Sequence, residues 1–357
     1  MVQPMPEQNL RTRGALVRPG RLVAGAVIAL AALTLSACGG GSGASSAADL
    51  PTGLEPQPLA EPTTLTVSIG TVAEAFAAVL LADKLGEFEK ENLTVDLVKL
   101  PAADSLPALA QGKTDVAAAG VGATALNAVN AGADIRLAFP GATKSPADGL
   151  YVTLDPATGK PRDVSTIATI AGPSGIATVP IGRYLESVGK SLSDVTFEQI
   201  PLADMQAALE AGAVDAAWVN APVTTVLDAT GQYAKVAGYE DGEYGVGYFL
   251  GPNLRSDHPE VGQAFVRALA RTVRDHLSGD YKADDATVAA LAESMESTPE
   301  AVRKTPSMTF AAELPTDAIQ AAQEDWLEIG DLLDFDRPMD PSGYLDPGPL
   351  DRAMQTS

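Results

Sequence analysis

Three residues are the obvious candidates for chemistry: Cys38, His258 and His276, the only cysteine and the only histidines in the chain. Nucleophilic catalysis needs an activated residue beside a base, and a metal site needs clustered ligands. No HExxH or CxxC pattern occurs. His258 lies at a predicted helix start, and His276 lies at a predicted helix end, where it complements the helix dipole. We therefore predict no catalytic residue, no metal site and no cofactor.

Cys38 closes an N-terminal segment typical of exported proteins. Four arginines precede residue 22, and residues 22–37 carry no charge, a stretch too short for a membrane span but suited to a secretory signal. Leu35-Ser36-Ala37-Cys38 resembles the lipobox of bacterial lipoproteins. The resemblance implies a signal peptide over 1–37, lipid attachment at Cys38 and a location outside the cytoplasm on the cell membrane. The alternative is that Cys38 is a small buried hydrophobic residue.

Residues 38–63 are rich in Gly, Ser, Ala and Pro, which predicts a flexible tether. The chain as a whole has 24 basic and 46 acidic residues, a formal net charge of −22. Such a charge repels nucleic acid and anionic lipid headgroups. We therefore exclude a nucleic-acid partner. The hydrophobic content of 46% over 357 residues indicates a globular protein large enough for about two domains.

From residue 65 onward, short apolar runs alternate with helical patterns, which indicates βαβ units and mostly parallel sheets. Strands are expected at 65–69, 95–100, 116–119, 135–139, 166–170, 196–200, 216–219 and 233–237. Helices are expected at 76–85, 105–111, 124–130, 181–188, 205–211, 222–229, 259–276, 284–294, 299–303 and 315–333. The Pro- and Asp-rich tail from Arg337 is predicted to be irregular, and the C-terminal helices are predicted to pack on the first lobe.

The chain also repeats itself at an offset of 100 residues. Residues 109–118 and 209–218 each read as a helix ending on glycine, a tight turn capped by aspartate and a buried strand of small residues. Such a turn is common in α/β proteins, so the repeated sequence is weak evidence by itself. Because it falls at the same point in the same order of elements, it predicts two related lobes.

With these elements in place, the chain resembles the type 2 periplasmic binding proteins. Among these it is most similar to the group for nitrate, for sulfonates such as taurine, and for the pyrimidine precursor of thiamine. The segments that carry the resemblance are 65–70 leading into 80–88, 112–124, 208–218 and 257–261. It implies two α/β lobes joined by two hinge crossings, near 143–149 and 245–249, with a ligand cleft between them. The implied division is lobe 1 at 64–146 and 247–357, and lobe 2 at 147–246.

Ligands of open α/β sheets bind at the carboxyl ends of the strands, where a loop opens a helix and backbone N–H groups are exposed. Four such corners can be read: 70–74, 120–124, 172–178 and 219–222. The predicted ligand-binding residues are Thr71, Phe76, Gly122, Thr124, Ser174, Gly175, Thr178, Trp218 and Asn220.

Each of these residues also has a purely structural explanation. Ser, Thr and Asn before helices are common N-caps, and Thr71 with Glu74 fits a capping box, which is favoured over a ligand role for Glu74. Trp218 fits a ring-stacking role and a core role equally well. The corners contain almost no Lys or Arg, so both a small anion held by helix N-termini and a neutral heteroaromatic ring remain open.

The resemblance implies a non-enzymatic solute-binding lipoprotein of an ABC importer. It would act as a monomer, closing over a sulfonate, nitrate, another small anion or a pyrimidine-like compound and passing it to a membrane permease. Two alternatives remain: an enzyme on the same fold, as in thiamine-pyrimidine synthesis, and a surface lipoprotein that binds a protein partner.

Overall fold

The computed structural model describes residues 50–70, 72–221, 223–243 and 245–355. The chain divides into two units, 1–43 and 44–357, and the description below concerns the second. The predicted signal peptide, Cys38, residues 38–49 of the predicted tether and Thr71 lie outside the described residues. The prediction of a flexible tether is wrong for residues 50–63, because the Gly53 N–H donates to the Arg352 carbonyl at 2.9 Å and the Leu59 N–H donates to the Glu91 carbonyl at 3.0 Å. In the described part, no helix combines the length and apolar character needed to cross a bilayer.

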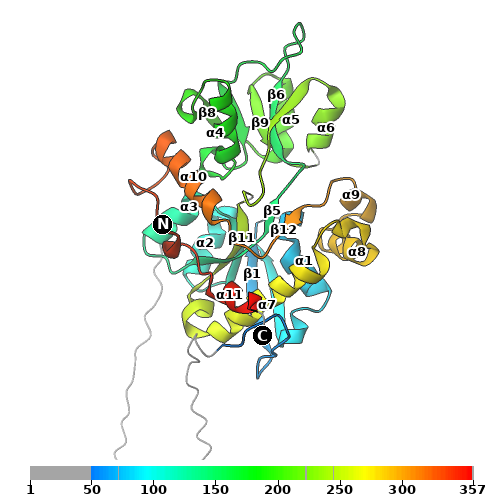
Figure 1. Cartoon of the computed structure of the whole chain (residues 1–357), viewed down its shortest axis with the longest axis vertical. Coiled ribbons are helices and arrows are strands. Elements are labelled where there is room, and N and C mark those ends of the chain that lie inside the picture. The colour runs from blue at the N-terminus through cyan, green and yellow to red at the C-terminus, as the bar shows by residue number, and fades with distance from the viewer. Residues whose placement is uncertain (1–49, 71, 222, 244, 356–357) are drawn as a thin grey trace, which may run out of the picture. The chain divides into compact units, whose positions relative to one another are not determined.

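One sheet has five strands, in the lower half of Figure 1. In the order in which they lie side by side, they are β2 (Leu93–Lys99), β1 (Thr63–Ile69), β3 (Val116–Gly120), β11 (Val246–Leu250) and β4 (Arg136–Pro140). β1 is parallel to both of its neighbours, whereas β11 is antiparallel to β3 and to β4. We call this sheet and the elements packed on it the first lobe.

A second five-stranded sheet repeats this arrangement in the upper half of Figure 1. Its strands are β8 (Thr196–Gln199), β7 (Thr166–Thr169), β9 (Ala216–Val219), β6 (Gly149–Thr153) and β10 (Tyr233–Ala237). β7 is parallel to both neighbours, and β6 is antiparallel to β9 and β10. The predicted fold class, α/β with two lobes of mostly parallel strands, is confirmed. We call this sheet with its helices the second lobe.

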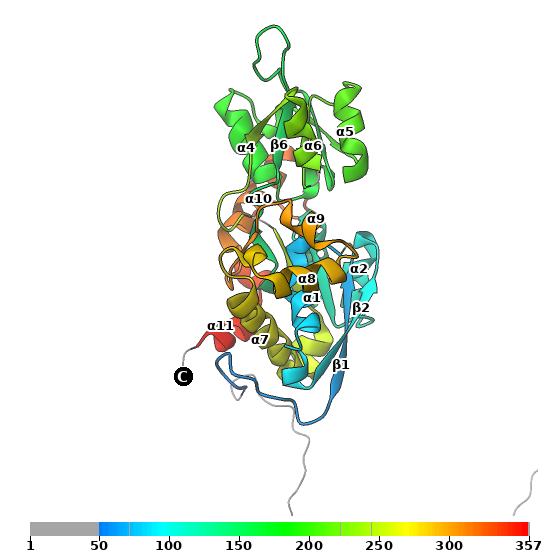
Figure 2. The same cartoon turned by 90° about the vertical axis from the view of Figure 1, so that its right-hand side faces the viewer.

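Helices connect the strands of each sheet and cover its faces (Figures 1 and 2). Those of the first lobe are α1 (Ala77–Lys84), α2 (Ala102–Ala110) and α3 (Ala123–Asn130). Those of the second lobe are α4 (Thr178–Ser187), α5 (Leu202–Glu210) and α6 (Val223–Thr230). The C-terminal helices are α7 (Pro259–His276), α8 (Asp285–Ser294), α9 (Pro299–Arg303), α10 (Thr316–Ile329) and α11 (Gly348–Met354).

Single helical turns and two short strands complete the fold. The turns are η2 (Glu74–Phe76), η3 (Glu89–Glu91), η4 (Gly172–Ser174), η5 (Leu192–Asp194), η6 (Asn253–Asp257), η7 (Tyr281–Ala283) and η8 (Pro341–Gly343). The short strands β5 (Ala142–Lys144) and β12 (Thr309–Phe310) pair antiparallel.

The 100-residue repeat holds at the level of single hydrogen bonds. The Asp115 carboxylate accepts from the Thr66 N–H at 2.8 Å, and the Asp215 carboxylate accepts from the Thr166 N–H at 3.0 Å. Gly112 and Gly212 end their helices with φ of 65° and 67°, a left-handed conformation that favours glycine. Each aspartate directly precedes a strand, β3 or β9, and therefore bonds the start of that strand to the parallel strand beside it, β1 or β7.

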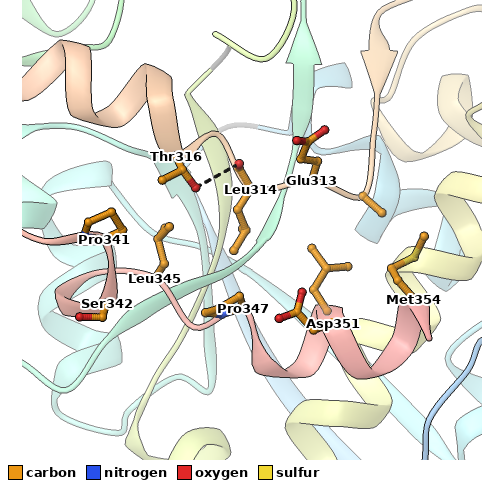
Figure 3. A pocket seen from close by; sticks show the side chains of 11 residues that line it. Glu313, Leu314, Thr316, Pro341, Ser342, Leu345, Pro347, Asp351 and Met354 are labelled. Atoms are coloured by element: carbon orange, nitrogen blue, oxygen red, sulfur yellow. Dashed lines mark hydrogen bonds between the residues drawn. The ribbon is translucent and has the colours of Figure 1, made fainter.

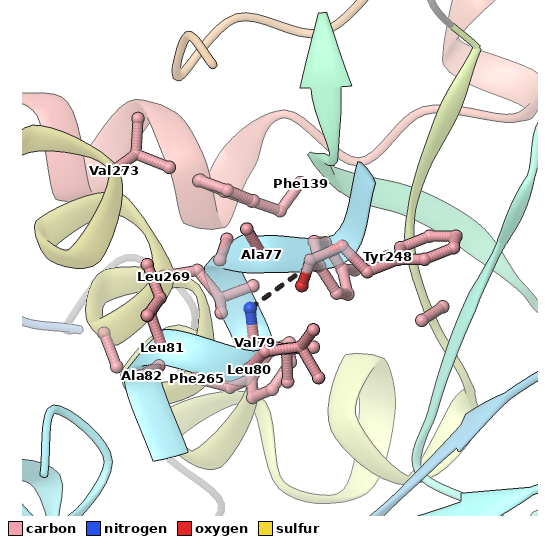
Figure 4. Packing of buried hydrophobic residues seen from close by; sticks show 14 of the residues in the cluster. Ala77, Val79, Leu80, Leu81, Ala82, Phe139, Tyr248, Phe265, Leu269 and Val273 are labelled. Carbon is pink, nitrogen blue, oxygen red and sulfur yellow. Dashed lines mark hydrogen bonds between the residues drawn. The ribbon is translucent and has the colours of Figure 1, made fainter. Parts of the chain in front are cut away.

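The first lobe has a large apolar core in which α1 packs on α7 (Figure 4). The Tyr248 hydroxyl accepts from the Val79 N–H at 3.2 Å and donates to the Phe76 carbonyl at 3.0 Å, so β11 is bonded to the start of α1. The Phe76 ring packs edge-on against Tyr248, with ring centroids 6.0 Å apart. The apolar periodicity that predicts a helix at 76–85 therefore reflects this core.

Two predictions about the C-terminal region are wrong. The tail after Arg337 is not irregular throughout, because it contains α11, whose Leu350 and Ala353 are buried in the core of the first lobe. In addition, α10 does not pack on the first lobe alone. Its Trp326 shares an apolar cluster with Leu126 of the first lobe and Val179 of the second. These contacts join segments far apart in the sequence, which local periodicity does not report.

Candidate functional site

A cavity of about 530 Å³ lies between the two sheets, at the ends of β3, β7 and β9. We call it the central cavity. Its walls come from both lobes. The wall on the side of the first sheet comprises Leu106, Ala119–Gly122, Thr124, Ala125, Gly245 and Val246. The wall on the side of the second sheet comprises Thr169–Ala171, Ser174–Ala177, Gln199, Trp218, Asn220 and Tyr239. Because the carboxyl ends of parallel strands meet there, the cavity lies where open α/β sheets bind ligands.

The lobes touch at the edge of the central cavity. Gly122 and Gly175 pair as an isolated antiparallel bridge. A Cβ atom built on Gly122 would lie 2.8 Å from the Ser174 carbonyl oxygen, and one built on Gly245 would lie 2.6 Å from the Ile176 side chain. The glycines at these positions therefore allow the two lobes to approach closely.

A second cavity of about 370 Å³, the side cavity, adjoins the first, and Asn220 lines both. The walls of the side cavity include Val72–Ala75, Ser145, Ala147, Asp148, Ala221 and several residues between Met295 and Met308. The Asn220 side-chain amide donates a hydrogen bond to the buried Asp148 carboxylate. This bond leaves the Asn220 amide nitrogen already engaged at the junction of the two cavities.

Glu74 lines the side cavity, but its carboxylate is engaged by the protein itself. Tyr281 donates its hydroxyl to Glu74, and the Lys282 ammonium group lies 2.8 Å from the same carboxylate. Lys282 also donates to the Thr305 hydroxyl at 2.9 Å. The capping-box assignment of Glu74 is wrong, since η2 has Ala73 as its N-cap and the carboxylate bonds to residues 207 and 208 positions away.

Two hydroxyl groups of the central cavity donate hydrogen bonds to nearby backbone carbonyls. Thr169 donates its hydroxyl to the Gly172 carbonyl at 2.5 Å, and Ser174 donates to the Ala171 carbonyl at 2.8 Å. The Trp218 ring contacts the Tyr239 ring edge-on, with centroids 4.7 Å apart. Burial, together with the nearby Asp148 and Glu243 carboxylates, raises the pKa of Tyr239 well above its ordinary value, so its phenol stays neutral.

The family model described as NMT1/THI5 like matches residues 73–279, more than half of the chain. The chain belongs to this family. The matched range runs through the first lobe, the whole second lobe and α7. A comparison with curated protein sequences returned no match.

Solved structures share the fold. The alkanesulfonate-binding protein SsuA from Xanthomonas axonopodis pv. citri, bound to MOPS, is 21% identical with a TM-score of 0.56, over 78% of this chain and 97% of that one. The periplasmic aliphatic sulphonate binding protein SsuA from Escherichia coli is 17% identical with a TM-score of 0.59, over 80% and 97%. The periplasmic nitrate-binding protein NrtA from Synechocystis PCC 6803 is 15% identical with a TM-score of 0.52, over 67% and 68%. At these identities the likeness establishes the periplasmic binding protein fold.

Six of the residues predicted to bind ligand lie together on the walls of the central cavity. They are Gly122, Thr124, Ser174, Gly175, Trp218 and Asn220. Phe76 and Thr178 line neither cavity, because the Phe76 ring is packed in the core and Thr178 is buried with its hydroxyl on the Gly175 carbonyl. Thr71 lies outside the described residues.

Sequence reasoning missed three polar wall residues: Thr169, Gln199 and Tyr239. Thr169 and Gln199 are the last residues of β7 and β8. The rule that finds the corners would have found both had it been applied to the final residue of each strand. Tyr239 follows β10 in a connection without a helix, so no corner pattern marks it.

The histidines lie away from both cavities. His258 is exposed and lies 3.6 Å from Glu260, His276 lies 3.6 Å from Glu87, and neither lines the central or the side cavity. Within the described ranges, no group of His, Cys, Asp and Glu side chains has the arrangement of a metal site.

A further cavity of about 600 Å³ lies under the C-terminal tail, between the segment before α10 and α11 (Figure 3). Its walls carry Glu313 and Asp351 among mostly apolar neighbours, and the Thr316 hydroxyl is turned to the Leu314 carbonyl. None of the predicted ligand-binding residues lines it.

Proposed function

We propose that this protein is the solute-binding component of an ABC importer and captures a small molecule in the central cavity by closing its two lobes. The observation that carries the proposal is that one cavity is walled by strand ends of both lobes, with six predicted ligand-binding residues on it. Membership of the NMT1/THI5-like family and a fold shared with sulfonate- and nitrate-binding proteins support it.

In this proposal the ligand bridges the lobes and shifts an open–closed equilibrium toward the closed form. The chain crosses between the sheets after β5, within the predicted range 143–149, and again between β10 and β11, and these two connections would be the hinges. The second crossing predicted near 245–249 is misplaced, because 246–250 forms β11 inside the first sheet. The Gly122–Gly175 contact would form on closure. Lobe 1 would comprise 64–146 and 247–357, and lobe 2 would comprise 147–246.

The rest of the importer is inferred from the family and the N-terminal sequence. The protein would be a monomer, exported by the signal at 1–37, tethered by the segment that begins at Cys38 and anchored outside the cytoplasm by a lipid on Cys38. It would deliver ligand to a membrane permease without catalysing a reaction. A ligand-binding component of an ABC-type import system from Staphylococcus aureus has the same fold, at 15% identity and a TM-score of 0.60.

The test combines thermal melting with small-angle scattering on the folded chain from residue 44. The compounds are nitrate, taurine, alkanesulfonates, pyrimidines, bicarbonate and aromatic carboxylates. Since a ligand bound only to the folded state raises stability, a true ligand should raise the melting temperature and also reduce the radius of gyration. If compounds that raise the melting temperature leave the radius of gyration unchanged, the proposed closure is contradicted.

A matched pair of variants tests closure at a single contact. Gly122→Ala places a methyl group against the Ser174 carbonyl, whereas Gly120→Ala, at the same corner, meets nothing closer than 3.9 Å. An overpacked contact of this kind costs about 1–3 kcal/mol, so Gly122→Ala should weaken ligand binding about tenfold or more. Gly120→Ala should close as the unmodified protein does. Equal binding and closure in both variants would contradict the mechanism.

A further inference from the structure

Two exposed side chains, Gln199 and Ile170, lie at neighbouring strand ends on the second lobe's wall of the central cavity. Gln199 is the last residue of β8, and Ile170 directly follows β7, the strand parallel to β8. The Ile200 N–H donates to the Thr169 carbonyl at 3.1 Å, so strand pairing continues at this point. A Cβ atom built on Gly172 would lie 3.7 Å from the Gln199 Cβ, so the η4 turn borders Gln199 as well. Strand pairing and the turn therefore determine where Gln199 lies.

Hydrogen bonding distinguishes Gln199 from several of its polar neighbours. The Thr169 and Ser174 hydroxyls donate to backbone carbonyls at the η4 turn, and the Asn220 amide donates to a buried carboxylate of the side cavity. Within the residues that the structure describes, the Gln199 amide has no hydrogen-bond partner in the protein, and neither has the exposed Thr124 hydroxyl on the first lobe's wall. The whole Gln199 amide is therefore available to a ligand in the cavity.

The walls of the central cavity offer donors and acceptors together. The Trp218 indole and the Tyr239 phenol carry donor hydrogens, and Asn220 keeps a second N–H and its carbonyl oxygen. The Gln199 amide presents an N–H donor and a carbonyl acceptor side by side. None of the described residues on these walls has a charged side chain. Recognition there consequently depends on matching donors with acceptors.

Ile170 adds an apolar surface close to this amide. Its side chain is 49% exposed although it lies on the wall of a cavity. Apolar surface that a ligand removes from water contributes favourably to binding. A ligand that covers Ile170 and reaches Gln199 therefore needs an apolar part directly next to a polar edge.

Building on the proposed function, we infer that Gln199 determines the specificity of the central cavity, and that the ligand is a carboxamide or lactam with an apolar part. The ligand places an N–H donor and the neighbouring carbonyl acceptor against the Gln199 amide, which forms two hydrogen bonds with them. Its apolar part covers Ile170. A group with acceptors only, or with donors only, pairs with half of the Gln199 amide and leaves the other half unpaired, which weakens binding.

The experiment compares three ring probes of nearly the same shape whose planar end groups differ. Benzamide presents one donor and one acceptor, benzamidine presents donors only, and benzoate presents acceptors only. Dissociation constants for the folded chain are measured by ligand-observed NMR in about 0.3 M salt, which screens the protein's net charge. Benzamide should bind about fivefold or more tightly than either of the others. Equal or weaker binding of benzamide overturns the inference, as does no binding of benzamide at all.

A charge-matched pair of variants tests Gln199 itself. Gln199→Glu keeps the size of the side chain and replaces its amide by two acceptor oxygens, which match the two N–H groups of benzamidine. The ratio of benzamidine affinity to benzamide affinity should rise about tenfold or more. Gln232→Glu makes the same charge change at an exposed residue of the second lobe that lines neither cavity, and it should leave the ratio unchanged. An unchanged ratio after Gln199→Glu, or an equal rise in both variants, overturns the assignment.

A second pair tests the apolar part of the inference. Ile170→Thr keeps the branched shape but removes apolar surface, so benzamide should bind about threefold more weakly. Val188→Thr makes a similar change at a side chain that is 53% exposed and lines neither cavity. It should leave benzamide binding unchanged. Equal binding of benzamide to both variants would show that the ring does not lie on Ile170.

The proposed function and this inference fail in different ways. If a nitrate, sulfonate or other compound of the first panel closes the lobes while the affinity ratio ignores Gln199, the solute-binding role stands and the assigned specificity is wrong. If no compound of either panel binds and none changes the radius of gyration, the solute-binding proposal itself fails.

Discussion

The two lobes have the same sheet order and the same aspartate-capped turn, yet they are stabilised differently. The first lobe encloses a network of buried charges and carries α7, α8 and α11. The second lobe has smaller apolar clusters, and some of its apolar residues pack against α10. The shared topology thus determines where the strand ends meet and where the cavity forms. The C-terminal helices determine how stable each lobe is.

The buried network of the first lobe joins α7 to the segment before β2. Arg267 lies 2.6 Å from Glu91, and Arg271 lies 2.8 Å from Glu91 and 2.5 Å from Glu87. Burial alone would raise the pKa of Glu91, but hydrogen bonds from Arg267 and Arg271, the charge of Arg267 and the Gln57 N–H outweigh it and lower the pKa. In the second lobe the Lys190–Asp163 pair is exposed instead, with Asp163 76% accessible.

The largest expected effect comes from Glu91→Gln. The change leaves two buried guanidinium groups without their shared carboxylate, and breaking a buried ion pair costs about 3–5 kcal/mol. The free energy of unfolding, measured by urea denaturation near pH 7, should fall by about that amount. Because the pKa of Glu91 is lowered in the folded state, its contribution is present above the unfolded pKa and is lost as pH falls, so the two proteins should converge in acid.

The matched control in the second lobe is Asp163→Asn, which removes an exposed pair worth about 0–1 kcal/mol. A loss after Asp163→Asn as large as that after Glu91→Gln would show that the lobes do not differ in this respect. In that case buried charges would not account for the difference in stability between the lobes.

Much of this fold follows from local sequence signals. The βα order, the glycine-ended helices and the bounds of α7 and α9 are predictable because each depends on residues within one or two turns. The strand β6 and the helix α11 are not, since β6 is a short apolar run and α11 is stabilised by distant contacts such as the Gln263 bond to the Pro349 carbonyl.

The candidate site divides in the same way. Gly122, Ser174 and Asn220 could be placed at the cavity because corners are local features that parallel topology brings together. The use of Glu74 could not be foreseen, because Tyr281 and Lys282 reach it from more than 200 residues away. The direction of the Thr169 and Ser174 hydroxyl protons likewise depends on the η4 turn, which periodicity does not report.

The contact of α10 with the second lobe is a further way in which the two lobes are stabilised differently. Asp325 on α10 faces α4, and burial, followed by the charges of Glu328, Glu186 and Glu324, raises its pKa to about 7, while Arg183 opposes the shift. Arg183 is itself paired with Glu243 and Glu240. Within the described residues, one carboxylate oxygen of Asp325 is buried without a hydrogen-bond partner. The second lobe is therefore held by a contact that is weaker when Asp325 is charged.

Asp325→Asn should stabilise the protein by about 2 kcal/mol above pH 7, less than the full shift implies because the carboxyl is partly open to solvent. A carboxyl whose pKa is raised on folding binds a proton more tightly in the folded state, so stability falls as pH rises from about 4 to 7. The variant should lack that fall and should lose its advantage near pH 4. Urea denaturation at several pH values measures the difference.

Asp317→Asn, an exposed change near the start of the same helix, is the control for altered net charge, because Asp317 is not among the charges that shift the pKa of Asp325; it should shift stability by less than about 1 kcal/mol. Stability curves of Asp325→Asn and the unmodified protein that run parallel from pH 5 to 8 would show that α10 does not couple the lobes through this group.

The smallest effect compares the repeated turns directly. Gly112→Ala and Gly212→Ala each force a left-handed conformation on alanine, which costs about 1 kcal/mol. In the first lobe the new Cβ would also lie 3.2 Å from the Asn253 side-chain oxygen, whereas nothing lies within 4 Å of the Cβ at Gly212. Gly112→Ala should therefore cost more, by up to about 1 kcal/mol, because Asn253 must shift from its 3.0 Å bond to Asp115.

Asn253→Ala makes this last comparison decisive. It removes the contact that only the first lobe's turn possesses, so in that background Gly112→Ala and Gly212→Ala should destabilise equally, as a double-mutant cycle in urea will measure. A difference that persists without Asn253 would mean that the two turns differ in their own backbone strain. In that case the two-lobed repeat would be a likeness of strand order and not of local energetics.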